Sequence, residues 1–198
     1  MSPDYLTAFA SLGTFLVIAV TAIAAVVQLR HIRASNQLAG MLYYVKFWET
    51  DAFQRANTFI NVELAAKLRD PDYRRELLGG TIDRTAHPEL VAADWCEQAG
   101  SCIKYGLIAE AQFLDLCGAY VDGTWEALKE VVAIRRVALG PALYENFEYI
   151  AALGKRWGRT HKRGNYPNRV PRLLSDEEAS ALTGSMRAQS DASKGAAD

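Results

Sequence analysis

The chain has 198 residues, of which about 120 remain once an N-terminal apolar run and a polar tail are set aside, the usual size of one domain. The hydrophobic fraction of 50% is raised by that run, so the rest has ordinary globular composition, and a net charge of −1 argues against a uniformly basic or acidic protein. The three cysteines are an odd number and form no CxxC pair, and on a cytoplasmic side we expect them to be reduced, buried apolar residues.

The first predicted element is an uncharged run over residues 6–29, bounded by Asp4 and Arg30. These 24 residues form about 36 Å of helix, enough to cross a hydrocarbon core of roughly 30 Å. A helix is the only single segment that satisfies its own backbone hydrogen bonds in lipid. The sequence therefore predicts a transmembrane helix over 6–29, after a short extracytoplasmic N-terminus over 1–5.

Flanking charge predicts the orientation of this helix. No Lys or Arg precedes the run, whereas Arg30, His31, Arg33 and Lys46 follow it. By the positive-inside rule the N-terminus faces out and the C-terminal domain lies in the cytoplasm. A cleaved signal is an alternative, because residues 22–24 have the small-x-small form of a cleavage site, but a basic n-region is missing and the apolar core is too long. A buried core helix is the third alternative.

The remainder is predicted to be all-α, because no stretch shows the sustained alternation of a half-buried strand. Apolar spacing continues the first helix over residues 34–49 and predicts an amphipathic helix from Phe53 to Leu68. We expect an irregular cytoplasmic bundle of five to seven helices over residues 30–157. The expected starts and stops are Asp51, Asp70-Pro71, Gly79-Gly80, His87-Pro88, Gly106, Gly123-Thr124, Gly140 and Pro141.

Residues 158–198 are predicted to form a flexible tail that is first basic and then disordered. Ser175 and Glu178 are placed to cap one short helix that ends at Leu182, and the last dozen residues have the composition of a disordered segment. Residues 34–154 hold 17 acidic and 11 basic residues, a net charge of −6, whereas residues 155–172 hold seven basic residues and no acid. The body and the tail therefore have opposite charge.

The basic tail residues are the only candidate contact residues that the sequence supplies. Three interpretations remain open: they dock on the acidic domain or stay solvated, they lie on anionic lipid headgroups, or they bind nucleic-acid phosphates. The candidates are Lys155, Arg156, Arg159, Lys162, Arg163, Arg169 and Arg172.

No pattern of catalytic or metal-binding residues is apparent. His31, His87 and His161 have no second His or Cys three or four positions on, and no Glu-x-x-His pair occurs, so we expect no metal and no cofactor. Glycine-rich phosphate loops and serine elbows require strands that the sequence does not predict. Asp94 and Glu97 share a helical face and either act as a general acid or, as we expect, face water.

Four phrases, HIRASNQ at 31–37, DPDYRREL at 70–77, KYGLI at 104–108 and YENFEY at 144–149, carry a family resemblance. Together they resemble an uncharacterised bacterial family of short proteins with one N-terminal span and a helical cytoplasmic domain. The resemblance implies placement in the bacterial inner (plasma) membrane. It brings no established activity, substrate or site residue.

The sequence thus predicts a single-pass protein whose helical domain is a binding or scaffolding module at the cytoplasmic face of the membrane. Its expected partners are the lipid bilayer and a protein, which includes a second copy of the chain. Whether the chain is an enzyme stays open, although no catalytic activity is evident. A membrane-tethered hydrolase or nucleotide-responsive effector with an unrecognised helical site is the alternative, and nucleic-acid binding through the tail is the third.

Overall fold

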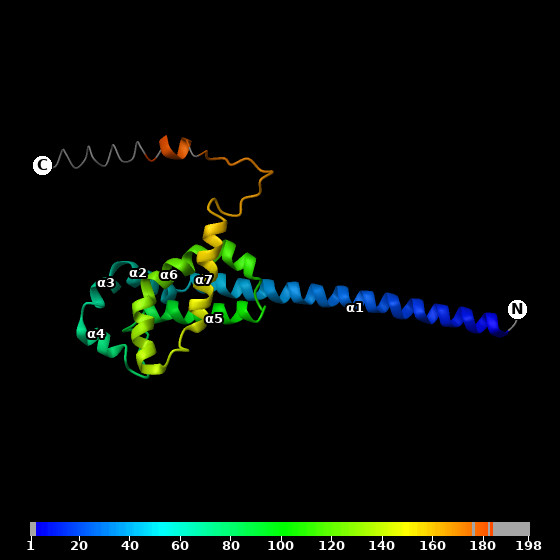
Figure 1. Cartoon of the computed structure of the whole chain (residues 1–198), viewed down its shortest axis with the longest axis horizontal. Helices are drawn as coiled ribbons and strands as arrows, with labels where there is room; N and C mark the ends of the chain where they lie inside the picture. Colours follow the sequence, from blue (N-terminus) through cyan, green and yellow to red (C-terminus); the bar gives the residue numbers. More distant parts are fainter. Residues whose placement is uncertain (1–2, 176, 182, 184–198) are drawn as a thin grey trace. The chain divides into compact units, whose positions relative to one another are not determined.

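The computed structural model of the chain describes residues 3–175, 177–181 and 183, and this described part contains helices and no strand, so the predicted all-α fold is confirmed. It forms two compact units, one up to Lys162 and one from Arg163 onward. Figure 1 shows the first unit's helices in chain order. They are α1 (Pro3–Trp48), α2 (Asp51–Val62), α3 (Leu64–Lys67), α4 (Pro71–Glu76), α5 (Glu89–Lys104), α6 (Glu110–Leu139) and α7 (Glu145–Thr160).

Helix α1 combines two kinds of surface in 46 uninterrupted residues. Its apolar part is long and apolar enough to cross a membrane, and side chains such as Phe15 and Ile23 are 69% and 65% exposed. Its last three turns, in contrast, pack on the helical domain, where Tyr44 is buried and Trp48 lies against the core. The predicted continuation of the first helix beyond residue 33 is confirmed.

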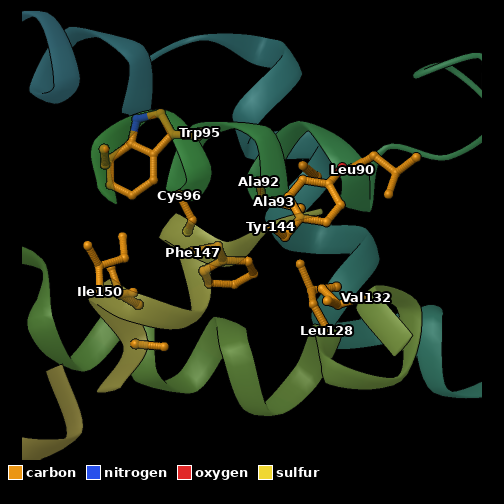
Figure 2. Close-up of a cluster of buried hydrophobic side chains, with 14 of the residues drawn as sticks. Leu90, Ala92, Ala93, Trp95, Cys96, Leu128, Val132, Tyr144, Phe147 and Ile150 are labelled. Carbon is orange, nitrogen blue, oxygen red and sulfur yellow. The ribbon is translucent and has the colours of Figure 1, made fainter. Parts of the chain in front are cut away.

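The core lies mainly between α5, α6 and α7 (Figure 2). Trp95 on α5 contacts the rings of Tyr44, Trp48, Phe53 and Tyr120, so one indole joins α1, α2, α5 and α6. Aromatic pairs of this kind add about 0.5–1.5 kcal/mol each to the burial of their surface. The end of α1 is therefore part of the domain's core.

Two glycines let helix α7 approach its neighbours. A Cβ on Gly154 would lie 2.5 Å from the carbonyl oxygen of Gly118 on α6, and a Cβ on Gly100 of α5 would collide with the carbonyl group of Asn146 on α7. Real Cβ atoms do not approach backbone atoms so closely, and protein interiors have little room to shift. Glycine at both positions therefore sets the spacing of the three-helix core.

The start of α2 and the break after it differ from the prediction. Thr50 caps α2 by accepting a hydrogen bond from the Phe53 amide, and Asp51 lies in the first turn. The amphipathic helix expected to reach Leu68 is interrupted at Glu63, so that α2 and α3 are separate. The apolar spacing gave no sign of this break, because Phe59 before it and Leu64 after it both face the core.

The expected break at Gly123-Thr124 is wrong, since α6 runs through both residues. Glycine inside a helix costs about 1 kcal/mol relative to alanine. Buried Val121, Thr124 and Leu128 on the same helix face offset that penalty by packing on the core. The last helix also starts later than Pro141: a turn ends at Tyr144, whose φ of 58° lies in the left-handed region, and α7 begins at Glu145.

Several other predicted signals are confirmed, whereas the helix that begins at Pro71 ends at Glu76, before the expected stop at Gly79-Gly80. Asp70 caps α4 through its own side chain, which accepts from the Asp72 amide at 2.9 Å, and Pro71 occupies the first turn. In the second unit, Ser175 and Glu178 form a capping box: the Glu178 amide donates to Ser175 Oγ, and the Ser175 amide donates to Glu178 Oε2. The predicted helix end at Leu182 and the last dozen residues lie outside the described residues.

Candidate functional site

The seven basic candidate residues are divided between the two units. Lys155, Arg156 and Arg159 belong to helix α7, so the basic segment begins inside the folded domain. Lys162 ends the first unit, whereas Arg163, Arg169 and Arg172 belong to the second. In that second unit the Arg172 guanidinium lies 4.8 Å from the centre of the Tyr166 ring and donates to the Arg163 carbonyl.

Two of these basic residues contact the acidic domain. Lys155 Nζ lies 3.4 Å from Glu126 Oε1, and the Arg156 guanidinium lies 3.4 Å from Glu110 Oε1, both on α6. The side chains of all four residues are about half exposed or more, and pairs of this kind stabilise a fold by about 0–1 kcal/mol. Lys155 and Arg156 are therefore part of the folded first unit, where they pair with acidic residues of α6.

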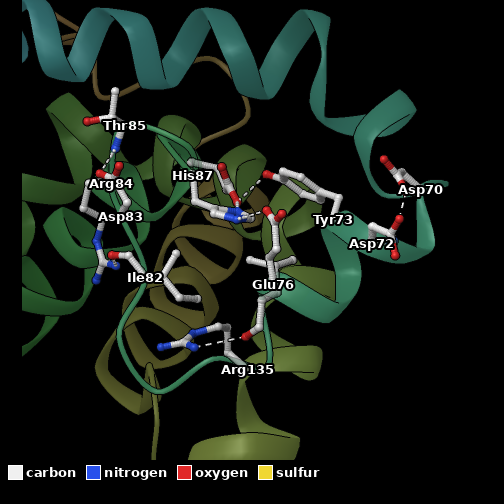
Figure 3. Close-up of polar contacts among 12 residues, drawn as sticks. Asp70, Asp72, Tyr73, Glu76, Ile82, Asp83, Arg84, Thr85, His87 and Arg135 are labelled. Carbon is white, nitrogen blue, oxygen red and sulfur yellow. Dashed lines mark hydrogen bonds and ion pairs between the residues drawn. The ribbon is translucent and has the colours of Figure 1, made fainter.

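The densest group of ionisable side chains lies between α4 and the start of α5 (Figure 3). Tyr73 donates from its hydroxyl to Glu89 Oε1 at 2.6 Å, and His87 Nδ1 lies 3.1 Å from the same oxygen. On the other side of the ring, His87 Nε2 lies 3.1 Å from Glu76 Oε2. We call Tyr73, Glu76, His87 and Glu89 the polar cluster.

Three of the four side chains of the polar cluster are buried. His87 is 2% exposed and Glu89 0%, while the Glu76 side chain is 63% exposed and alone reaches solvent. Burial and the hydrogen bond to Glu89 raise the pKa of Tyr73 far above its ordinary value, which keeps the phenol protonated. A substrate would have no access to the buried pair. The polar cluster is therefore better suited to holding α4 and α5 together through hydrogen bonds than to acid-base chemistry.

Asp94 and Glu97, which we expected to face water, instead bind the start of α7. Asp94 accepts from the Tyr144 hydroxyl at 2.9 Å and from Arg84 Nε at 2.9 Å. Glu97 accepts from the Asn146 amide group and, at 2.8 Å, from the Phe147 backbone amide. A carboxylate at a helix N-terminus satisfies amide groups that have no partner inside the helix. Both acids are therefore engaged in fixing α7 on α5.

The cysteines show the burial expected of apolar residues at two of three positions. Cys96 and Cys117 are buried, and Cys102 is partly buried with its sulfur 3.4 Å from the Tyr44 hydroxyl. Burial raises the pKa of the Cys117 thiol to about 12, and burial together with Cys117 raises the pKa of Cys96 as well. Neither buried thiol has thiolate character near neutral pH, so neither is suited to nucleophilic chemistry.

The described part of the chain contains no arrangement of side chains suited to a metal ion. No group of three or more His, Cys, Asp or Glu side chains there is arranged to hold an ion.

Two grooves on the first unit are open to a ligand. The first, of about 650 Å³, lies between α2 and the segment that leads into α5. Its wall carries both signs of charge, with Asp51, Arg55 and Glu63 on one side and Arg84 on the other. We call it the polar groove.

The second groove, also about 650 Å³, lies between α1 and the loop that joins α5 to α6. It extends along α1 from Leu29 to Tyr44, and Tyr105 and Leu107 stand at its edge with exposed fractions of 73% and 59%. We call it the juxtamembrane groove, because it begins at the end of the apolar run.

Neither the polar cluster nor the two grooves followed from the sequence. Each combines residues that are far apart in the chain, such as Tyr73 with Glu89 or Arg33 with Gly106, and one sequence does not show such pairing. The local signals that exist are weak: a His two positions before a Glu at a helix start, and two large apolar residues around the helix-ending Gly106.

Comparison with known proteins adds a family and no function. A family model described as a domain of unknown function (DUF4760) matches residues 15–157. No curated protein and no solved structure matches the chain.

Proposed function

The chain belongs to the family described as a domain of unknown function (DUF4760), and we propose that it is a single-pass membrane protein whose helical domain binds a protein partner at the cytoplasmic face of a bacterial inner membrane. The mechanism is positional. The span confines the domain to the membrane surface, and the polar groove presents its charges to the partner.

The observation that carries the proposal is the double role of α1. One uninterrupted helix supplies an exposed apolar part of membrane-spanning length and, at its other end, the buried Tyr44. A contiguous exposed apolar surface marks a contact site, and the length of this one matches the thickness of a bilayer. A cleaved signal is not needed by the mature fold, whereas α1 is continuous with the core. The basic residues Arg30 and Arg33 after the apolar run support a cytoplasmic position of the domain.

Binding is favoured over catalysis by where the charges lie. Three of the four ionisable residues of the polar cluster are buried, whereas those of the polar groove are accessible. Arg55 is exposed in this groove and forms no ion pair within the described residues. Unpaired charge on a concave surface is suited to a partner of opposite charge.

Membrane placement is tested by extraction and proteolysis. We expect the full chain to stay with membranes in alkaline carbonate, and protease added from the cytoplasmic side to digest the helical domain. Release by carbonate, or loss of the first two dozen residues from the purified chain, would contradict the anchor.

Partner binding is tested by crosslinking and affinity capture from membranes. We expect Arg55→Glu to remove the captured partner, while Lys67→Glu, an exposed charge reversal outside the polar groove, retains it. A chain cut after Lys162 should also retain it, because the polar groove lies in the first unit. Retention by Arg55→Glu with loss from the cut chain would assign binding to the tail instead.

A further inference from the structure

The juxtamembrane groove is held in a fixed geometry at the end of the apolar run. Gln37 on α1 donates to the carbonyl of Gly106 at 3.3 Å, which fastens the α5–α6 loop to the helix. One turn on, the helix and the loop meet closely, since a Cβ on Gly40 would lie 3.3 Å from the Ile108 side chain. Helix α1 therefore forms one wall of the groove and residues 105–108 form the other.

The lining residues occur in a definite chemical order along α1. Leu29 and Ile32 are apolar and lie nearest the span, Arg33 follows, and Asn36 and Gln37 lie one turn further on. At helical rise, Arg33 lies about 6 Å beyond Leu29 along the helix axis. If Leu29 ends the hydrocarbon region, Arg33 lies at the level of the lipid headgroups. The order apolar, cationic, amide matches the acyl chain, phosphate and polar headgroup of one phospholipid.

Arg33 has no competing partner among the residues that the structure describes. Its guanidinium is exposed and forms no hydrogen bond or ion pair with the described residues. It faces the loop across the groove, 3.5 Å from the position that a Cβ on Gly106 would take. The absence of a side chain at Gly106 leaves space beside the cation.

The α5–α6 loop adds two side chains suited to the headgroup level of a membrane. Tyr105 and Leu107 are largely exposed on either side of Gly106. Tyrosine is enriched at the membrane–water boundary, where its ring is apolar and its hydroxyl reaches water. Their exposure is unfavourable in water and favourable against lipid.

We propose that the juxtamembrane groove binds one anionic phospholipid of the adjacent leaflet, with its phosphate at Arg33 and an acyl chain along Leu29 and Ile32. This site rests on the membrane anchoring of the proposed function. The bound lipid would contact both the span and the α5–α6 loop. This double contact would fix the helical domain against the membrane surface.

The experiment uses the full chain in vesicles of zwitterionic lipid that contain an anionic phosphatidylglycerol with a photoreactive diazirine in its acyl chain. Mass spectrometry then locates the lipid adducts after illumination. We expect adducts on residues 105–108 as well as on the span. Arg33→Gln should lower the groove adducts about fivefold, the effect of one phosphate contact. Arg30→Gln, which removes a cation outside the groove, is the matched control and should leave them nearly unchanged.

The outcomes separate this site from the anchor. Adducts on residues 11–28 without adducts on residues 105–108 would overturn the groove and leave the membrane span intact. Equal losses in Arg33→Gln and Arg30→Gln, or equal labelling by a zwitterionic diazirine lipid, would overturn the specific phosphate contact. Absence of adducts on the span as well would overturn the anchor on which both proposals rest.

Discussion

At the scale of single residues, the Tyr73 hydroxyl stabilises a carboxylate that has little other support. Glu89 is 0% exposed, its Oε1 is shared by Tyr73 and His87, and its Oε2 has no partner in the described structure. Tyr73→Phe removes one donor from a buried acid, and we expect it to lower the free energy of unfolding by about 1–3 kcal/mol. Chemical denaturation of the full chain in detergent measures this, with exposed Tyr105→Phe as a control that should change stability by less than about 0.5 kcal/mol.

The same phenol makes the fold sensitive to alkali. Burial raises the pKa of Tyr73 well above its ordinary value of 10, so the folded state holds the proton where the unfolded state loses it. The contribution of Tyr73 to the free energy of unfolding is therefore fully present below pH 10 and is lost as the pH rises toward the folded-state pKa. Tyr73→Phe should make the fall of unfolding free energy with pH shallower, whereas Tyr105→Phe should not. Equal slopes in both variants would contradict the contribution of Tyr73.

Burial also predicts which thiols react. Cys96 and Cys117 are buried with raised pKa values, and Cys102 is partly exposed. Because the thiolate is the reacting species, we expect at most one equivalent of a thiol reagent to react with the folded chain at pH 8, and all three thiols to react in denaturant. Replacing Cys102 by Ser should abolish the reaction of the folded chain. Rapid labelling of a second thiol would show that the α5–α6 core opens readily.

At the scale of helices, close packing makes two glycines sensitive to a single methyl group. Gly154→Ala would place a Cβ against the Gly118 carbonyl and force α7 away from α6, and we expect a loss of about 1–3 kcal/mol in unfolding free energy. Gly123 on α6 has no neighbouring atom within 4 Å of its Cβ position, so Gly123→Ala should instead stabilise by about 1 kcal/mol. Thermal unfolding of both variants measures these two changes in stability. A stabilised Gly154→Ala would contradict the close approach of α6 and α7.

Helix existence was predictable from the sequence, and helix boundaries were predictable where a local signal sets them, such as a side-chain cap or the helix-ending Gly140. Asp70-Pro71 gave a correct start because the Asp70 side chain caps the helix and the φ of Pro71 is fixed. His87-Pro88 also marked a correct start, where Pro88 is the N-cap residue and no side chain caps the helix. Gly123 gave a wrong stop because tertiary packing on the α6 face outweighs a local penalty. The prediction that Asp94 and Glu97 face water was wrong because a tertiary contact decides their position. Their partners at the start of α7 lie about 50 positions away in the chain.

At the scale of the whole molecule, α1 links the two environments that the chain occupies in our proposal. A flexible linker after the span would let the domain tumble above the membrane. Tyr44 and Trp48, which contact Trp95, instead build the end of α1 into the core, so any tilt of the span moves the domain with it. This coupling brings the α5–α6 loop to the membrane surface and explains why exposed Tyr105 and Leu107 are tolerated there.

The buried core of the described residues lies within the first unit. All buried apolar side chains of the described residues lie between Tyr44 and Leu153. A chain that ends at Lys162 should therefore unfold within about 0.5 kcal/mol of the full chain.

A chain that ends at Gly140 tests the opposite case, because it lacks α7 and with it the fully buried Phe147 and Ile150. Removing a buried Phe or Ile alone costs about 2–5 kcal/mol, and total stability is only about 5–15 kcal/mol. Loss of the whole helix would also uncover the face that α5 and α6 share with it. We expect no cooperative unfolding transition by circular dichroism in detergent for this shorter chain, while α1 keeps its helical signal. A cooperative transition would mean that α1, α2, α5 and α6 form a stable core around Trp95 without α7.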